Sequence, residues 1–183
     1  FRWLPADARD IPLDEATVDA VVSSFMLQRV EGRGGLLHEV RRVLRPGGTF
    51  SFVTWLAEDL VVDADRAYDE VLAELGHEPA AAGFRAPHAT DYRTPDEARA
   101  ELSAAGFAEV ETWPEELHAR WDPYSYLRLK EQLDDHERFE ALEKPAREDL
   151  RHRLLARWAE LPDEAFDLRS PLVAGVAREG RSA

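Results

Sequence analysis

The sequence predicts an α/β fold in which strands and helices alternate along the chain. The apolar run at residues 18–25 (VDAVVSSF) is typical of a parallel strand that is covered on both faces. A helical pattern follows it, and a Pro-Gly-Gly turn ends that helix directly before a second β-rich run at residues 49–55. A strand, a helix and a strand in this order form a βαβ crossover, which makes the two strands parallel neighbours on one sheet.

Periodicity supplies the other elements of the first half. Residues 1–5 are short and aromatic, and we expect them to form the end of a strand. Residues 35–45 and residues 63–75 each place their apolar side chains at helical spacing on one face. Gly76 follows the second of these helices, where a glycine commonly ends a helix.

The helix at residues 94–106 has the clearest boundary residues in the chain. Thr94 is the expected N-cap, Pro95 the first helical residue and Glu97 the partner in a capping box, while Gly106 ends the helix. A strand is predicted at residues 107–112 with a continuation to Trp121. A helical region then extends from residue 122 to about residue 161, and the apolar run at residues 172–177 (LVAGVA) is the expected closing strand.

Composition excludes several classes of protein and of site. The 183 residues are 44% hydrophobic and 33% charged, as in ordinary globular domains. There is no cysteine, so disulfides and thiolate metal sites are excluded, and the histidines lack the spacing of a metal site. No apolar run approaches the length of a membrane span and no leader is visible, so we expect a cytoplasmic protein without a membrane partner.

The formal net charge of −14 argues against a nucleic acid partner, because phosphate backbones repel an acidic surface. The one dense basic cluster has a simpler explanation. Arg41, Arg42 and Arg45 fall at the end of the predicted helix, where cations suit the helix dipole, and Arg42 lies three residues from Glu39, at the spacing of an ion pair.

Several motifs in the first two thirds of the chain occur in the order of a known family. They are Asp7-Ala8, Ile11-Pro12, Asp19 at the start of a strand, the EVRRVLRPGG stretch at residues 39–48, and TPDEARAELSAAGFAEVE at residues 94–111. In this order and spacing the sequence resembles the class I S-adenosylmethionine-dependent methyltransferases, specifically the type 11 or UbiE-like branch that acts on small molecules. The resemblance covers residues 3–112 and resumes weakly at the final strand.

The resemblance implies a Rossmann-like methyltransferase sheet, mostly parallel with an antiparallel last strand, and extra helices near the C-terminus. The family's glycine-rich loop and the acidic residue after its second strand would precede Phe1, so we expect a partial methyltransferase domain that lacks its first strands. We expect the 183-residue chain alone to bind S-adenosylmethionine poorly, because the ribose and methionine contacts are missing. Its predicted parts are the core strands and helices at residues 1–121, a helical insertion at residues 122–165 and the closing strand at residues 166–183.

The resemblance also implies a cofactor site for S-adenosylmethionine. It assigns Asp7 to the adenine amino group, with the backbone of Ala8 beside it, and places Ser24 and Phe25 near the sulfonium end. Each residue has a structural alternative: Asp7 can simply form a turn, and residues 23–26 can be a strand end that packs on the next helix. Asp19 is assigned a structural role.

Acceptor contacts are expected from two places. Met26 and Gln28 follow the strand that ends near the cofactor, and His88 and Tyr92 lie in the aperiodic segment at residues 76–93, which is either a binding loop or a solvated connector. No catalytic base is assigned. A further set of aromatic side chains either forms a core or lines an acceptor pocket with the inserted helices: Trp113, Trp121, Tyr124, Tyr126 and Trp158.

The predicted function is methyl transfer from S-adenosylmethionine to a small-molecule acceptor. Because the cofactor carries the reactive group, the protein mainly has to hold the methyl group in line with the acceptor. The alternative is a non-catalytic methyltransferase-like module or a protein-interaction domain.

Overall fold

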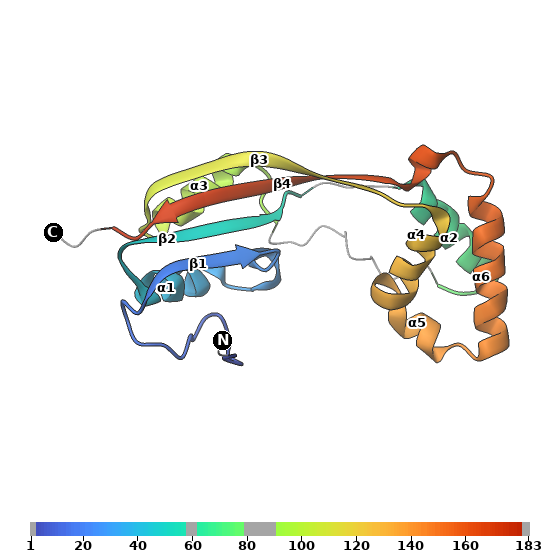
Figure 1. Cartoon of the computed structure of the whole chain (residues 1–183), viewed down its shortest axis with the longest axis horizontal. Helices are drawn as coiled ribbons and strands as arrows, with labels where there is room; N and C mark the ends of the chain where they lie inside the picture. The colour runs from blue at the N-terminus through green and yellow to red at the C-terminus, as the bar shows by residue number, and fades with distance from the viewer. Residues whose placement is uncertain (1–2, 58–61, 79–90, 181–183) are drawn as a thin grey trace. The chain divides into compact units, whose positions relative to one another are not determined.

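The computed structural model describes residues 3–57, 62–78 and 91–180. Strands and helices alternate as predicted (Figure 1). The elements are β1 (Val18–Ser24), α1 (Arg33–Val43), β2 (Leu44–Trp55), α2 (Asp63–Glu74), α3 (Pro95–Ala104), β3 (Ala108–Arg120), α4 (Pro123–Leu129), α5 (His136–Ala141), α6 (Lys144–Trp158) and β4 (Asp167–Arg178). Short 3-10 helices are η1 (Leu27–Arg29) and η3 (Asp163–Phe166), and a π-helical turn is η2 (Lys130–Asp134).

The chain forms two compact units, and each is described by itself. The sheet unit comprises Phe1–Glu58, Pro87–Glu116 and Ser170–Ala183, and the helical unit comprises Asp59–Ala86 and Leu117–Arg169. Strands β3 and β4 contribute residues to both. Helix α2 belongs to the helical unit, together with the helices that follow Leu117.

The sheet has the strand order β1-β2-β4-β3. Strand β1 pairs with β2 in parallel, which confirms the βαβ crossover, and β4 pairs with β2 in antiparallel orientation, which confirms the antiparallel closing strand. Residues 3–5 lie outside any strand, contrary to the prediction for residues 1–5. A strand needs a hydrogen-bonded neighbour, and β1 is the edge strand of the described sheet.

The Pro-Gly-Gly residues lie inside β2 and not in a turn before it. Helix α1 ends at Val43 and β2 begins at Leu44, and the register with β1 then jumps, so that Leu44 pairs with Val18 but Thr49 pairs with Ala20. The extra residues form a bulge, and Gly47 adopts a φ of +78°, which favours glycine.

The core of the sheet unit lies on one face of the sheet. Phe50 and Phe52, two residues apart on β2, are buried against side chains of both α1 and α3. The other face is less covered, since Val22 on β1 is 78% exposed. The prediction that residues 18–25 are covered on both faces is therefore wrong: the run is apolar, but only one side of it meets a helix within the described part of the chain.

The boundary of α3 confirms the predicted cap. Thr94 Oγ1 accepts a hydrogen bond from the Glu97 amide at 3.2 Å, and Pro95 is the first helical residue. The Glu97 carboxylate reaches back one residue further than in a capping box and accepts from the Arg93 amide at 2.8 Å.

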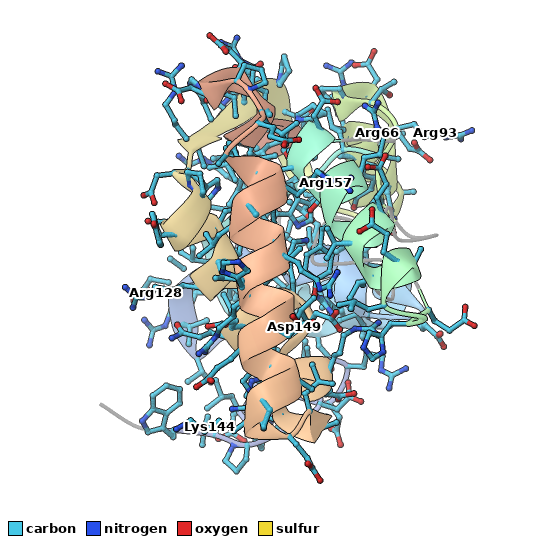
Figure 2. All side chains as sticks on the ribbon, turned by 90° about the vertical axis from the view of Figure 1, so that its right-hand side faces the viewer. Arg66, Arg93, Arg128, Lys144, Asp149 and Arg157 are labelled. Atoms are coloured by element: carbon cyan, nitrogen blue, oxygen red, sulfur yellow. The ribbon has the colours of Figure 1, made fainter. Side chains whose placement is uncertain are left out.

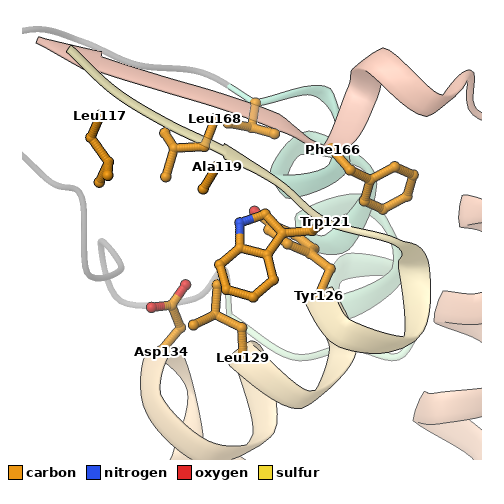
Figure 3. Close-up of a pocket in the computed structure, with 9 residues that line it drawn as sticks. Leu117, Ala119, Trp121, Tyr126, Leu129, Asp134, Phe166 and Leu168 are labelled. Atoms are coloured by element: carbon orange, nitrogen blue, oxygen red, sulfur yellow. The ribbon is translucent and has the colours of Figure 1, made fainter.

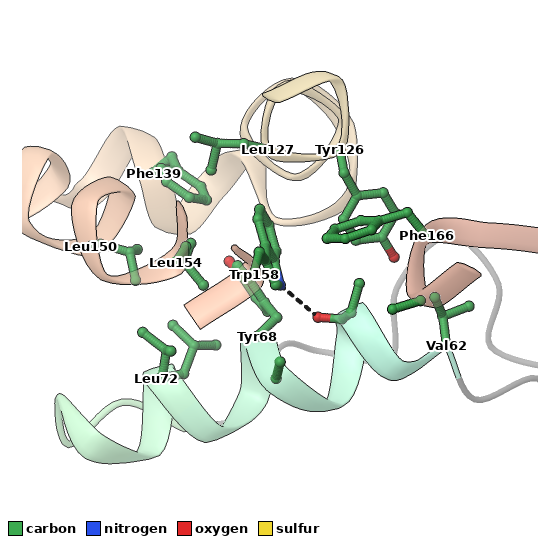
Figure 4. Close-up of a cluster of buried hydrophobic side chains, with 14 residues drawn as sticks. Val62, Tyr68, Leu72, Tyr126, Leu127, Phe139, Leu150, Leu154, Trp158 and Phe166 are labelled. Atoms are coloured by element: carbon green, nitrogen blue, oxygen red, sulfur yellow. Dashed lines mark hydrogen bonds between the residues drawn. The ribbon is translucent and has the colours of Figure 1, made fainter. Parts of the chain in front are cut away.

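The helical unit has a core of its own, around Trp158. The indole of Trp158 is fully buried, and its Nε1 donates to the Ala64 carbonyl at 3.0 Å, which ties α6 to the start of α2 (Figure 4). Tyr126 and Phe166 pack edge-on against the same indole, with ring centroids 5.5 and 5.9 Å away. At the surface, Arg157 of α6 donates to Glu70 of α2 at 2.7 Å (Figure 2). Tyr126 and Trp158 are thus core residues, one of the two predicted alternatives.

Candidate cofactor and acceptor site

The carboxyl end of β1 is exposed and conformationally strained. Ser24, the last residue of the strand, is exposed, and Phe25 follows it with a φ of +51°. This conformation is unfavourable for a residue with a side chain, and such residues cluster at ligand sites. Two contacts hold it: the Phe25 amide donates to the Val53 carbonyl at 2.9 Å, and the Phe25 ring lies 4.6 Å from that of Trp55.

Met26 and Gln28 continue the chain into η1, and the structure places them differently. Met26 is 41% exposed, whereas the side chain of Gln28 is buried. Gln28 Nε2 donates to the Phe25 carbonyl at 2.9 Å, and Gln28 Oε1 accepts from the Thr54 hydroxyl at 2.6 Å. Gln28 therefore stabilises the turn at Phe25, and its contact with an acceptor stays a prediction.

Asp7 lies in an exposed turn and binds Arg9 with both carboxylate oxygens. The Arg9 amide and Nε donate to Asp7 Oδ1 at 2.8 and 3.0 Å, and Arg9 Nη2 donates to Oδ2 at 2.7 Å. These hydrogen bonds stabilise the ionised carboxylate and lower the pKa of Asp7 to about 2. The Asp7 side chain stays about half exposed, so both oxygens can accept a further hydrogen bond from a ligand.

The Asp7 turn contacts the segment that connects β1 to α1. Arg9 Nη1 donates to the Glu31 carbonyl at 3.3 Å, just before α1 begins, and α1 is the helix that follows β1. Ala8 packs against the core of the sheet unit. The Asp7 turn therefore lies beside the start of α1, the helix that follows the carboxyl end of β1, and open α/β sheets bind ligands beyond the carboxyl ends of their strands.

Glu39 and Arg42 fix the segment between that turn and β1. As predicted, they form an ion pair, at 2.8 Å. Glu39 Oε2 also accepts from the Ile11 amide at 2.9 Å, and Arg42 donates to the Ile11 and Leu13 carbonyls at 2.8 and 2.7 Å. The Arg42 hydrogen bond, with the one from Ile11, lowers the pKa of Glu39 to about 2.

The other arginines of the basic cluster are also paired. Arg41 binds Glu179, and Arg45 donates to Asp19 at 2.7 Å, so each of the three arginines has a carboxylate partner. Asp19 therefore has the structural contact that the sequence assigned to it.

The structure describes only one of the two residues expected as acceptor contacts in the aperiodic segment at residues 76–93. His88 lies outside the described residues. Tyr92 is fully buried, with its ring 4.1 Å below the Arg33 guanidinium, and its backbone forms an isolated parallel bridge with Leu56. The contact of each with an acceptor stays a prediction.

One polar cluster, which lies in the helical unit, was not predicted from the sequence. Lys130 of η2 is buried and forms ion pairs with Asp65 and Asp134 at 2.6 and 2.9 Å. The one available signal was composition, since Lys130 is one of only two lysines among 23 basic residues.

Two further absences hold for the described ranges only. Residues 3–57, 62–78 and 91–180 contain no group of three acidic, histidine or cysteine side chains placed to hold a metal ion. Within the same residues, no helix has the length and apolarity that a membrane crossing requires.

Comparisons with known proteins relate part of the chain to methyltransferases. A family model described as a methyltransferase domain matches residues 1–52. The ubiquinone/menaquinone biosynthesis C-methyltransferase UbiE of Caulobacter vibrioides is 35% identical over 79 residues, which are 42% of this chain and 31% of that protein. The demethylmenaquinone methyltransferase of Streptomyces avermitilis is 32% identical over 118 residues, which are 59% of this chain and 51% of that protein.

Solved structures show the same fold at low sequence identity. The Bacillus halodurans protein BH2331, which is named as a methyltransferase, superposes with a TM-score of 0.52 at 16% identity, over 96% of this chain and 70% of that one. The YcgJ protein of Bacillus subtilis gives a TM-score of 0.50 at 16% identity, over 97% of this chain and 70% of that one.

The chain spans about a third to a half of the curated relatives that it matches. The family model, the UbiE-like relatives and the sheet with its antiparallel closing strand all indicate a methyltransferase domain. Residues 1–52 thus match a methyltransferase domain, and the chain is similar to class I S-adenosylmethionine-dependent methyltransferases of the UbiE-like type.

Proposed function

We propose that this protein transfers a methyl group from S-adenosylmethionine to a small-molecule acceptor. One observation carries the proposal: in a chain similar to this family, the ionised carboxylate of Asp7 lies in a turn that contacts the segment between the strained end of β1 at Phe25 and α1. Ligands of open α/β sheets bind beyond the carboxyl ends of the strands.

These residues fit the cofactor. Asp7 is held in place by Arg9 and has oxygens left to accept a hydrogen bond from the adenine amino group, with the Ala8 backbone beside it. Ser24 and Phe25 would contact the sulfonium end. When bound, the cofactor supplies an electrophilic methyl group, so these residues mainly have to orient it and exclude water.

The acceptor would approach from the residues that follow β1. Met26 is exposed there, and Gln28 fixes the turn beneath it through the Phe25 carbonyl. His88 and Tyr92 are the further proposed contacts. Both curated relatives described above are named for quinone substrates or pathways, which makes a quinone-type ring the first acceptor to test.

Titration calorimetry of the full-length protein with S-adenosylhomocysteine tests the proposal. Asp7→Asn should weaken binding about tenfold, because a neutral amide oxygen accepts a weaker hydrogen bond than a charged carboxylate does. Asp14→Asn removes a charge seven residues further along an exposed segment and should leave the affinity unchanged. No binding to the unmodified protein, as a non-catalytic module predicts, would overturn the proposal, and equal affinities of the two variants would remove Asp7 from it.

A further inference from the structure

The helical unit contains a cavity of about 100 Å³ that is open on one side (Figure 3). Eight of its nine lining residues are apolar or aromatic, and the ninth, Asp134, is charged. Trp121, Tyr126 and Phe166 supply three aromatic rings. A cavity of roughly 150 Å³ can enclose benzene, so this one can take most of a single ring while the remainder stays in the opening. The lining is thus typical of a small-molecule site, with many apolar walls and few polar groups.

Two buried polar atoms on residues that line this cavity have no hydrogen-bond partner in the described structure. One is Oδ1 of Asp134, whose side chain is only 9% exposed, and the other is Nε1 of Trp121. Buried polar groups in folded proteins are nearly always paired, because an unpaired one costs about 1–3 kcal/mol. An unpaired acceptor and an unpaired donor on the walls of one cavity therefore require an explanation, and a ligand provides one.

Asp134 is an ionic partner of Lys130 through one of its two oxygens only. Its Oδ2 accepts from Lys130 Nζ at 2.9 Å, and the same ammonium group binds Asp65 at 2.6 Å. Lys130 thus binds two carboxylates, and only Oδ2 of Asp134 takes part in its ion pair. Hydrogen-bond donors to the Asp134 carboxylate are consequently favoured.

The position of Lys130 and Asp134 in the chain also suggests a specialised site. They are the first and last residues of η2, a π-helical turn between α4 and α5. Such turns are rare and frequently occur at functional sites. The turn places the ammonium group of Lys130 5.3 and 5.4 Å from the ring centroids of Tyr68 and Tyr126, which further fixes the carboxylates that it binds.

Three kinds of polar group on a ring can be compared. A carboxylate would be repelled by Asp134, and an ammonium group would offer no acceptor to the Trp121 indole. A hydroxyl is both donor and acceptor, so it suits Asp134 Oδ1 as a donor and Trp121 Nε1 as an acceptor. We propose that this cavity binds a single aromatic ring that carries a hydroxyl group, a ligand of the phenol class, with Asp134 Oδ1 accepting its proton.

The test uses 4-methylphenol as the probe and is made without any cofactor, so its result is independent of the proposed methyl transfer. The chain has five tryptophans, and the indole signal of Trp121 in an ¹H–¹⁵N spectrum is assigned by its loss in Trp121→Phe. We expect 4-methylphenol to shift this signal with millimolar affinity, as suits a ligand of this size. We expect 4-methylanisole, which lacks the hydroxyl proton, to bind about tenfold more weakly.

Variants locate the site. Asp134→Asn should weaken 4-methylphenol binding about tenfold, whereas Asp149→Asn, at an exposed position on α6, should not. Should Asp134→Asn fail to fold, Ala119→Leu keeps the charges and fills the cavity, and it should abolish the Trp121 shift. The proposal is overturned if 4-methylphenol leaves the Trp121 signal unchanged, if 4-methylanisole or benzylamine binds as tightly, or if Ala119→Leu binds 4-methylphenol normally.

Discussion

Arg9 binds both carboxylate oxygens of Asp7, through Nε at 3.0 Å and Nη2 at 2.7 Å, two residues away in the same turn. Asp7, the proposed hydrogen-bond acceptor for the adenine amino group, is therefore oriented before any cofactor binds. A site formed in advance loses less conformational entropy on binding than one that has to be ordered by its ligand.

Arg9→Gln should raise the pKa of Asp7 from about 2 toward the ordinary value of 3.8, because it removes the largest stabilising hydrogen bonds to the ionised form. An NMR titration of the Asp7 carboxyl group measures this change directly. In the full-length protein the same variant should weaken S-adenosylhomocysteine binding several-fold, since Asp7 becomes free to rotate. An unchanged pKa would show that Arg9 does not hold Asp7 in solution.

Glu39→Gln should reduce the dependence of stability on acid pH. The folded pKa of Glu39, about 2, lies below its ordinary value of 4.5, so the carboxylate stabilises the fold above pH 4.5 and this contribution is lost as the pH falls toward 2. Urea unfolding at a series of pH values should show a smaller loss across this window in Glu39→Gln than in the unmodified protein. Glu148→Gln, an exposed control on α6, should keep the full loss, and equal pH profiles for all three proteins would contradict the role of Glu39.

Gly106→Ala should destabilise the protein by about 1–2 kcal/mol or more. Gly106 has a φ of +91°, and a Cβ there would lie 2.4 Å from Arg41 Nη1, which donates to the Ala105 carbonyl. Gly34→Ala is the matched control: it lies in α1 with open space around it and should be neutral or stabilising by about 0.4–1 kcal/mol. Thermal unfolding of both variants checks the pair, and an equal effect of the two would contradict the assigned backbone conformation.

Trp158→Ala should cost about 3–5 kcal/mol and unfold the helical unit, because it leaves a large cavity at the centre of that core. Trp158→Phe keeps a ring but loses the hydrogen bond to Ala64, so its cost should be smaller. Trp113→Ala, at a position 39% exposed, should cost less than about 1 kcal/mol. Circular dichroism during urea unfolding measures all three, and a small effect of Trp158→Ala would show that the core in Figure 4 is wrongly assigned.

Local signals in the sequence were enough to predict the βαβ crossover, the cap of α3 at Thr94 and the pair of Glu39 with Arg42, since each depends on residues close in the chain. Two features were missed because they depend on tertiary neighbours. The exposure of Val22 follows from which faces of the sheet are covered, and the bulge at Gly47 follows from how β2 pairs with β1.

Some residues of the two proposed sites could likewise be predicted from local sequence, and others depend on tertiary contacts. Motif order brought Asp7, Ser24 and Phe25 to attention, and the structure places the first in a turn beside the start of α1 and the other two at the carboxyl end of β1. The cluster at Lys130 joins Asp65 and Asp134, which are 69 residues apart in the sequence, and no local pattern marks such a contact. Gln28 looked available from its position, but its hydrogen bonds to Phe25 and Thr54 depend on how η1 folds back on the sheet.

An ¹H–¹⁵N chemical-shift map of S-adenosylhomocysteine binding to the full-length protein tests the proposed cofactor site directly. We expect the largest changes on the amides of Ala8, Ser24, Phe25 and Met26, in the Asp7 turn and at the carboxyl end of β1. No change at saturating ligand, or changes confined to the residues of the helical unit, would contradict this prediction.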